Sequence, residues 1–343
     1  MDQPTTIGLD LAKSVFQVHG VSADGTAVLR RQLRRGQVLA FFARLDPCLI
    51  GMEACSGAHH WARELAALGH EVRLMPAAYV KPYVKRGKTD RADAEAICEA
   101  VTRPTMRFVP VKSAEAQAAL LDHKARDFLI RQQTQTVNTI RAHLAEFGIV
   151  VAKGIHNVDR LLEAVEHASE AARPALDLLA DQFRDLRERI ETVTKRIEAA
   201  QKADPLARRL ATIPGLGPIA SSAVTPKACL WRDAVTTPDV AAFRSARDYS
   251  AWLGLTPKPH SSGGKERLGR ISKAGNRYLR RLLYLGAMAQ IAARRRGRPG
   301  ADWLWKMLER KPVKVVAIAL ANRMARVVWA LIRTGESYRA DPA

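Results

Sequence analysis

Strand and helix signals alternate through the first hundred residues, and this order limits the possible folds more than any other feature of the chain. Short apolar segments typical of strands occupy 6–9, 15–21, 27–33, 47–55 and 71–75, and an Asp-Gly turn at 24–25 joins two of them as a hairpin. Helical spacing occupies 37–45, 57–68 with Ser56 as its expected N-cap, and a segment that starts at residue 90. Strands that alternate with helices predict an α/β layer fold with a mixed sheet.

Four acidic side chains lie where these predicted elements begin or end. Asp10 follows the first strand in GLDLAK, Glu53 ends a later strand in GMEACSG, and Asp90 and Asp93 share one face of a predicted helix. Carboxylates from separate elements can meet at one edge of a sheet, where hard oxygen ligands suit Mg²⁺ or Mn²⁺ and can polarise a phosphodiester. The alternative is that each acid is solvated, although the apolar neighbours of Asp10 and Glu53 argue against it for those two.

The middle of the chain has a long helical pattern. Apolar residues recur at intervals of three and four, first at Val137, Ile140, Leu144 and Phe147 and then at Leu176, Leu179, Phe183, Leu186, Ile190, Val193 and Ile197. The second series covers three heptads and predicts a coiled coil. We expect its seam to recruit a partner strand; a helical hairpin that packs only on its own chain is the alternative.

The charge of the chain indicates its partner. Its 343 residues contain 55 Lys and Arg against 34 Asp and Glu, a formal net charge of +21. Such an excess predicts a polyanionic partner, and the 6% aromatic content favours binding of the nucleic-acid backbone over stacking on bases.

Several protein classes are disfavoured. The four cysteines form no CxxC pair, which argues against a zinc ribbon and a disulfide framework. The GxxxxGK[ST] motif of P-loop NTPases is absent from the sequence, which argues against that class of enzyme. The chain starts without a signal-peptide pattern, and charged residues interrupt the apolar stretch 313–332. We therefore expect a cytoplasmic, DNA-associated protein without a membrane span, in which 313–332 is a buried or DNA-facing helix.

Residues 210–224 have the form of a helix-hairpin-helix motif. Gly215 and Gly217 allow a tight turn, and the backbone N–H groups at the start of the following helix can receive a phosphate. Such a motif binds the nucleic-acid backbone without reading its sequence. A plain helical hairpin is the alternative.

A Ser-Ser-Gly-Gly segment further along the chain carries two candidate nucleophiles. Ser261 and Ser262 precede basic residues that can offset the charge of an attacked phosphate. Taken alone, such a segment is also typical of a linker. The basic residues expected to contact phosphates here and on the helix that follows are Lys265, Arg267, Arg270, Lys273, Arg277, Arg280 and Arg281, although a solvated basic face is the alternative for the helix.

Five linked motifs resemble the DEDD transposases of bacterial insertion sequences. They are GLDLAK, GMEACSG, KTDRADAEAI, IPGLGPIASSA and AWLGLTPKPHSSGGKERLGRISKAGNRYLRRLL, in the order of that family and over nearly the whole chain. The resemblance implies a RuvC-like domain of the RNase H fold over 1–112, a helical coiled-coil segment over 113–203 and a mainly helical C-terminal transposase domain over 204–343.

The resemblance also implies roles for individual residues and partners. Asp10, Glu53, Asp90 and Asp93 become metal ligands, and a serine of the 261–262 pair becomes the nucleophile that attacks DNA; we favour Ser262 because glycine follows it. Donor and target double-stranded DNA, a structured guide RNA encoded by the element, and a homo-oligomer (dimer or tetramer) are the implied partners. Two alternatives stay open: a junction or RNA nuclease that uses water, and a nucleic-acid-binding module without catalysis.

Overall fold

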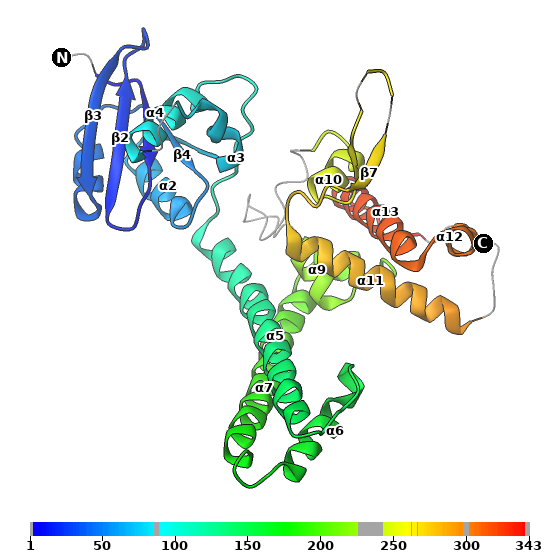
Figure 1. The fold of residues 1–343 in the computed structure, drawn as a ribbon. Coiled ribbons are helices and arrows are strands. Elements are labelled where there is room, and N and C mark those ends of the chain that lie inside the picture. Colours follow the sequence, from blue (N-terminus) through cyan, green and yellow to red (C-terminus); the bar gives the residue numbers. More distant parts are fainter. Residues whose placement is uncertain are drawn as a thin grey trace. The chain divides into compact units, whose positions relative to one another are not determined.

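The computed structural model describes residues 3–85, 89–225, 243–261, 263–265, 267–297 and 302–339 (Figure 1). These residues form two compact units, of which the first extends to Gln117 and the second begins at Ala118. The expected boundary after residue 112 lies close to this division. The other expected boundary, after residue 203, falls inside the second unit.

The first unit contains a five-stranded mixed sheet. Its strands are β1 (Thr6–Asp10), β2 (Val15–Val21), β3 (Ala27–Arg34), β4 (Leu49–Glu53) and β5 (Glu71–Met75), in the order β3-β2-β1-β4-β5. Strand β1 is antiparallel to β2 and parallel to β4, and β4 is parallel to β5. The predicted α/β layer with a mixed sheet is confirmed, and it is consistent with an RNase H-like DEDD domain.

Helices cover both faces of this sheet. They are α1 (Val38–Phe42), α2 (Ala58–Ala67), α3 (Ala77–Val80) and α4 (Asp90–Val101), with 3₁₀ turns η1 (Arg35–Gln37) and η2 (Lys81–Tyr83). Side chains of β1, β2, α1 and α2 form one apolar core, in which Leu9, Phe16 and Phe42 are fully buried. On the other face α4 lies directly against β1, because Gly8 has no side chain: a Cβ there would be 2.1 Å from the carbonyl oxygen of Ala94.

The start of α2 differs from the prediction. Gly57, not Ser56, is the N-cap, and its φ of 87° lies in the left-handed region that glycine adopts most easily. No side chain caps this helix, so the assignment of Ser56 was wrong. The start of α4 does have a side-chain cap, because the hydroxyl of Thr89 accepts a hydrogen bond from the N–H of Ala92 at 3.2 Å.

The predicted helical middle consists of α5 (Ala114–Glu146), η3 (Ile155–Asn157), α6 (Val158–Glu163), η4 (Ala164–His167) and α7 (Arg173–Ala203). The seam of α7 is buried within the single chain, with Leu176 2%, Leu186 4% and Ile197 3% exposed. Leu176 belongs to the same apolar cluster as Ile140 and Leu144 of α5. This burial favours the helical hairpin over a coiled coil that recruits a partner strand through this seam.

The remaining helices of the second unit share one apolar core. They are α8 (Pro205–Leu210), α9 (Pro218–Val224), α10 (Ala246–Trp252), α11 (Arg277–Arg296), α12 (Trp303–Arg310) and α13 (Val313–Thr334), with a hairpin of β6 (Pro257–Pro259) and β7 (Leu268–Ile271). Helix α13 is long and apolar enough to cross a membrane by length and composition. It is nevertheless the central core helix here, because Val316, Leu320 and Val328 are buried in that core.

Candidate metal centre and serine loop

Three of the four predicted acids converge at one edge of the sheet in the first unit. Asp10 ends β1, and Asp90 and Asp93 lie in the first turn of α4. One carboxylate oxygen from each of the three lies within 4.8 Å of the others. The sequence folds this way locally because the Thr89 cap fixes where α4 begins and Gly8 lets α4 approach β1.

Glu53 lies at the same edge of the sheet. It ends β4, which pairs in parallel with β1 through Leu9 and Met52, so the two strands carry their terminal acids side by side. The charge of Glu53 raises the pKa of Asp10, although Glu53 does not belong to the three-acid cluster itself.

The environment of Asp10 disfavours its ionised form. Burial, followed in order of importance by the negative charges of Asp93, Asp90 and Glu53, raises the pKa of Asp10 from 3.8 to about 6. Several carboxylates this close repel one another, and a divalent cation would relieve the repulsion. Oxygen donors from aspartate and glutamate are those that hard divalent ions prefer, so this set of residues fits such a metal ion.

One of the two predicted serines, Ser261, lies in the loop between β6 and β7. Ser261 is exposed, whereas Ser262 lies outside the described residues. Gly263 and Gly264 have φ values of 57° and 75°, which explains the two glycines in this turn. Lys265, Arg267 and Arg270 are all exposed on the same hairpin.

The segment predicted as a helix-hairpin-helix contains α8, a turn and α9, and packing explains the first glycine of the turn. Gly215 has a φ of 81°, and a Cβ on it would be 2.7 Å from the carbonyl oxygen of Gly286 on α11. The side chain of Gln290 also donates a hydrogen bond to the carbonyl of Pro214. Gly217 is exposed as the N-cap of α9, a helix of seven residues.

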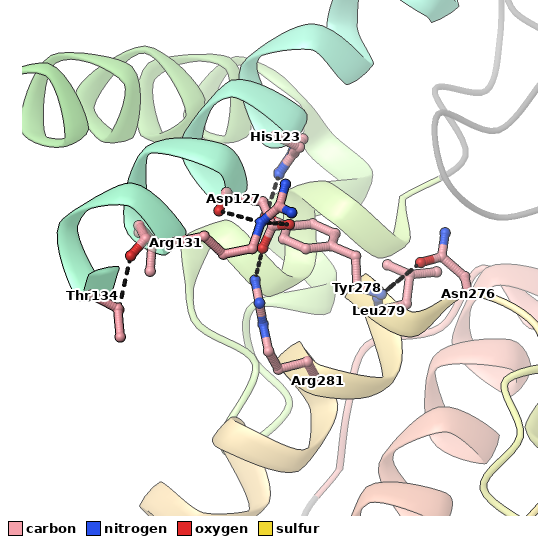
Figure 2. Close-up of polar contacts among 9 residues, drawn as sticks. His123, Asp127, Arg131, Thr134, Asn276, Tyr278, Leu279 and Arg281 are labelled. Atoms are coloured by element: carbon pink, nitrogen blue, oxygen red, sulfur yellow. Dashed lines mark hydrogen bonds and ion pairs between the residues drawn. The ribbon is translucent and has the colours of Figure 1, made fainter. Parts of the chain in front are cut away.

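The basic residues around α11 divide into two groups. Arg280 donates to the backbone carbonyls of Leu253 at 2.8 Å and Ala274 at 2.6 Å, and Arg281 forms an ion pair with Asp127 of α5 (Figure 2). These two arginines therefore hold the fold of the second unit together. Lys273 and Arg277 are exposed to solvent.

Comparisons with known proteins agree with this architecture. Residues 7–149 match the DEDD transposase model of IS110 elements, and residues 207–300 match a family described as "Transposase IS116/IS110/IS902 family". The chain is similar to the probable family 20 transposase of Pseudomonas aeruginosa, at 47% identity over 97% of this chain and 98% of that protein. It is also similar to the transposase for insertion sequence element IS1328 of Yersinia enterocolitica, at 38% identity over 98% of each chain. The transposase for insertion sequence element IS1111A of Coxiella burnetii is 36% identical over 97% of this chain and 91% of that protein. The chain therefore belongs to the IS110/IS116/IS902 family of transposases, enzymes that cleave and rejoin DNA.

Proposed function

We propose that Asp10, Glu53, Asp90 and Asp93 hold Mg²⁺, or Mn²⁺ in its place, at the site where this transposase cuts a DNA strand. The observation that carries the proposal is the convergence of Asp10, Asp90 and Asp93, whose carboxylate oxygens lie within 4.8 Å of one another. When bound, the metal ion supplies Lewis-acid polarisation of the phosphodiester and charge stabilisation for the attacking and leaving oxygens.

The protein residues of this centre have distinct tasks. Asp10 must be deprotonated to act as a ligand, and its pKa of about 6 makes this state the main one at neutral pH. Asp90 and Asp93 are positioned by the first turn of α4, and the N-cap Thr89 determines where this helix begins. Glu53 supplies the fourth carboxylate from the neighbouring strand.

The second part of the proposal assigns the nucleophile to the serine loop. The Oγ of Ser262, or of Ser261, bonds to phosphorus while the bond from phosphorus to the strand's leaving oxygen breaks, and that oxygen departs as a hydroxyl. The phosphoserine ester conserves the bond energy, so a hydroxyl of another strand can later displace the serine and rejoin the DNA. Lys265, Arg267 and Arg270, exposed on the same hairpin, offset the charge of the phosphate.

The third part concerns partners. Rejoining two DNA molecules requires that both be held at once, which a dimer or tetramer does naturally. We propose that such an oligomer acts on donor and target DNA and that a structured RNA encoded by the element guides it. The net charge of +21 supports polyanionic partners of both kinds. The acids and the serine must meet at one phosphodiester, within one chain or between two.

A covalent-adduct assay tests this mechanism. The wild-type chain is incubated with Mg²⁺, element-end DNA and the RNA encoded next to the gene, and products are separated on a denaturing gel. We expect a protein–DNA adduct that Ser262→Ala abolishes and Ser261→Ala retains. If the adduct is lost only in Ser261→Ala, Ser261 is the nucleophile. Strand cleavage by the wild-type chain without any adduct supports a nuclease that uses water. Full strand transfer by Asp93→Asn contradicts the metal-site proposal.

A further inference from the structure

The outer strand β3 carries arginines on both of its faces. Arg30, Arg31 and Arg34 are exposed along the strand, and Arg35 follows at its end. Strand β3 is at the edge of the sheet, where β2 is its partner strand in the part of the chain that the structure describes (Figure 1). The sequence LRRQLRRG matches no catalytic motif, and the only signal it carries is its charge.

Strand register assigns these arginines to two faces. Asp10 of β1 lies opposite Gln17 of β2, and Gln17 lies opposite Gln32 of β3. Directly opposed residues of antiparallel strands point to the same face, so Gln32 shares the face of Asp10. Arg30 and Arg34, two residues to either side of Gln32, also share that face. This row of residues begins roughly 10 Å from Asp10, the width of two strand spacings.

The other two arginines lie on the opposite face. The guanidinium of Arg31 is 5.7 Å from the ring centroid of Phe41, and that of Arg35 is 5.1 Å from the ring centroid of Trp61. Both rings belong to the side of the sheet that α1 and α2 cover. Arg31 and Arg35 are therefore held on aromatic rings, away from the face that carries the acids.

The arginines of the acid-bearing face have acidic groups nearby but no direct ion pair with them in the described residues. Arg30, Arg34 and Arg91, the last beside Asp90 on α4, form no ion pair with any residue in the described ranges. Glu95, the next acid along α4, is bound to Lys85 at 2.6 Å, and this contact, with a smaller contribution from the charge of Arg30, lowers the pKa of Glu95. Burial lowers the pKa of His19, which lies among these groups, and so favours its neutral form.

We propose that this face, defined by Arg30, Gln32, Arg34 and Arg91, binds the sugar-phosphate backbone of the DNA duplex whose strand reaches the acidic cluster. The proposal rests on the proposed function only in naming which duplex is bound. A cluster of carboxylates repels the phosphates that flank a scissile bond, so cations beside it are needed to hold the strand. Arg30 and Arg34 are about 13 Å apart along β3, which allows them to contact separate phosphates. Charged side chains on an edge strand can have a different role, which is to prevent pairing with a strand of another molecule. That role applies equally to the arginines on both faces of β3, whereas phosphate binding beside the acids requires only those on the acid-bearing face.

Two double variants of the full chain test the proposal with equal changes in charge. Arg30→Gln with Arg34→Gln removes two cations from the acid-bearing face, and Arg31→Gln with Arg35→Gln removes two from the opposite face. Binding to a short duplex of arbitrary sequence is measured in EDTA over a range of salt concentrations. Each lost phosphate contact reduces the slope of log K against log salt by about 0.9, so we expect the first pair to lower it by about 1.8 and the second to leave it unchanged. Circular dichroism and thermal unfolding confirm that both variants are folded.

Three outcomes would overturn the proposal. An equal loss in both variants indicates a general charge effect, and an unchanged slope in the first indicates no phosphate contact at this face. A loss seen with a structured RNA probe but not with duplex DNA assigns the face to RNA. Because the assay contains no divalent ion, it is independent of the metal proposal: Asp93→Asn must bind the duplex at least as tightly as wild type, whatever its effect on strand transfer.

Discussion

The hydroxyl of Tyr278 on α11 lies 3.1 Å from Nδ1 of His123 on α5, a contact between residues 155 positions apart in the chain (Figure 2). The other ring nitrogen, Nε2, lies 3.2 Å from the hydroxyl of Ser222 on α9. Hydroxyl groups can donate or accept, so this buried imidazole has a partner at each nitrogen in either tautomer. Together with the ion pair between Arg281 and Asp127, these contacts tie the helical hairpin to the C-terminal core of the second unit.

We therefore expect Tyr278→Phe to destabilise the second unit. The substitution removes the hydroxyl at Nδ1 of a side chain that is 3% exposed, and a lost hydrogen bond in such a place costs about 1–2 kcal/mol. Tyr284→Phe on the same helix is the matched control, because the Tyr284 hydroxyl makes no hydrogen bond with the described residues. Urea unfolding should show the loss for Tyr278→Phe alone; equal midpoints for the two variants would contradict a structural role for this contact.

A second prediction concerns Gly8, which positions the metal centre without touching it. In Gly8→Ala, the new Cβ would lie 2.1 Å from the carbonyl oxygen of Ala94 and 2.4 Å from the backbone nitrogen of Cys98, so α4 must move away from β1. Asp90 and Asp93 move with the helix, and we expect Mn²⁺ affinity, measured by calorimetry, to fall at least about tenfold, which is 1.4 kcal/mol.

The control for this variant is Gly36→Ala. An added Cβ at Gly36 meets nothing within 4 Å, and we expect wild-type Mn²⁺ affinity there. Wild-type affinity in Gly8→Ala as well would show that the helix does not need this close approach to hold the acids in place.

The seam of α7 gives a third prediction. Leu186 is 4% exposed within one chain, and Leu186→Ala should cost about 2–4 kcal/mol of folding free energy because it leaves a cavity. Leu178 on the same helix is 69% exposed, and Leu178→Ala should have little effect. Under conditions where Leu186→Ala is still folded, sedimentation should show the same oligomeric state for this variant as for wild type. Dissociation of a folded oligomer by this variant would restore the seam as an interface between chains.

Local sequence patterns predicted the sheet of the first unit because its strands and its tight turn depend on residues that are close together in the sequence. The five strands lie where apolar runs and the Asp-Gly turn indicated, and Asp10 and Glu53 end their strands as expected. The proximity of Asp10 to Glu53 also follows from this order, since the parallel strands β1 and β4 carry their carboxyl ends to one edge of the sheet.

Other features depend on contacts that no local pattern contains. A repeat of apolar residues in α7 shows that one face is buried but not whether the covering helix belongs to the same chain. The ion pair of Arg281 with Asp127 joins residues 154 positions apart, so the local pattern indicated a basic helix face without showing that one of its arginines is engaged. The N-cap of α2 depends on a left-handed backbone at Gly57, which overrides the usual preference for serine.

The last prediction concerns the pH dependence of the metal-free protein. The pKa of Asp10 is about 6 in the folded chain against an ordinary value of 3.8. Between these values the folded state binds more protons than the unfolded state, so stability falls as pH rises through this window and stays low above it. Asp10→Asn cannot ionise, and in EDTA it should be more stable than wild type at pH 7, by about 1 kcal/mol after allowance for solvent screening, with no difference of that kind at pH 4.

The comparison needs a matched control for the removal of an acidic side chain from the first unit. Asp46→Asn, an exposed acid of the same unit, should leave the difference between pH 4 and pH 7 as in wild type. Adding Mg²⁺ at pH 7 should stabilise wild type and Asp46→Asn but not Asp10→Asn, because binding to the folded state shifts the unfolding equilibrium only where the ligands are intact. If Asp10→Asn keeps the wild-type pH profile in EDTA, the carboxylates do not repel one another as the structure indicates, and the case for a cation among them fails with it.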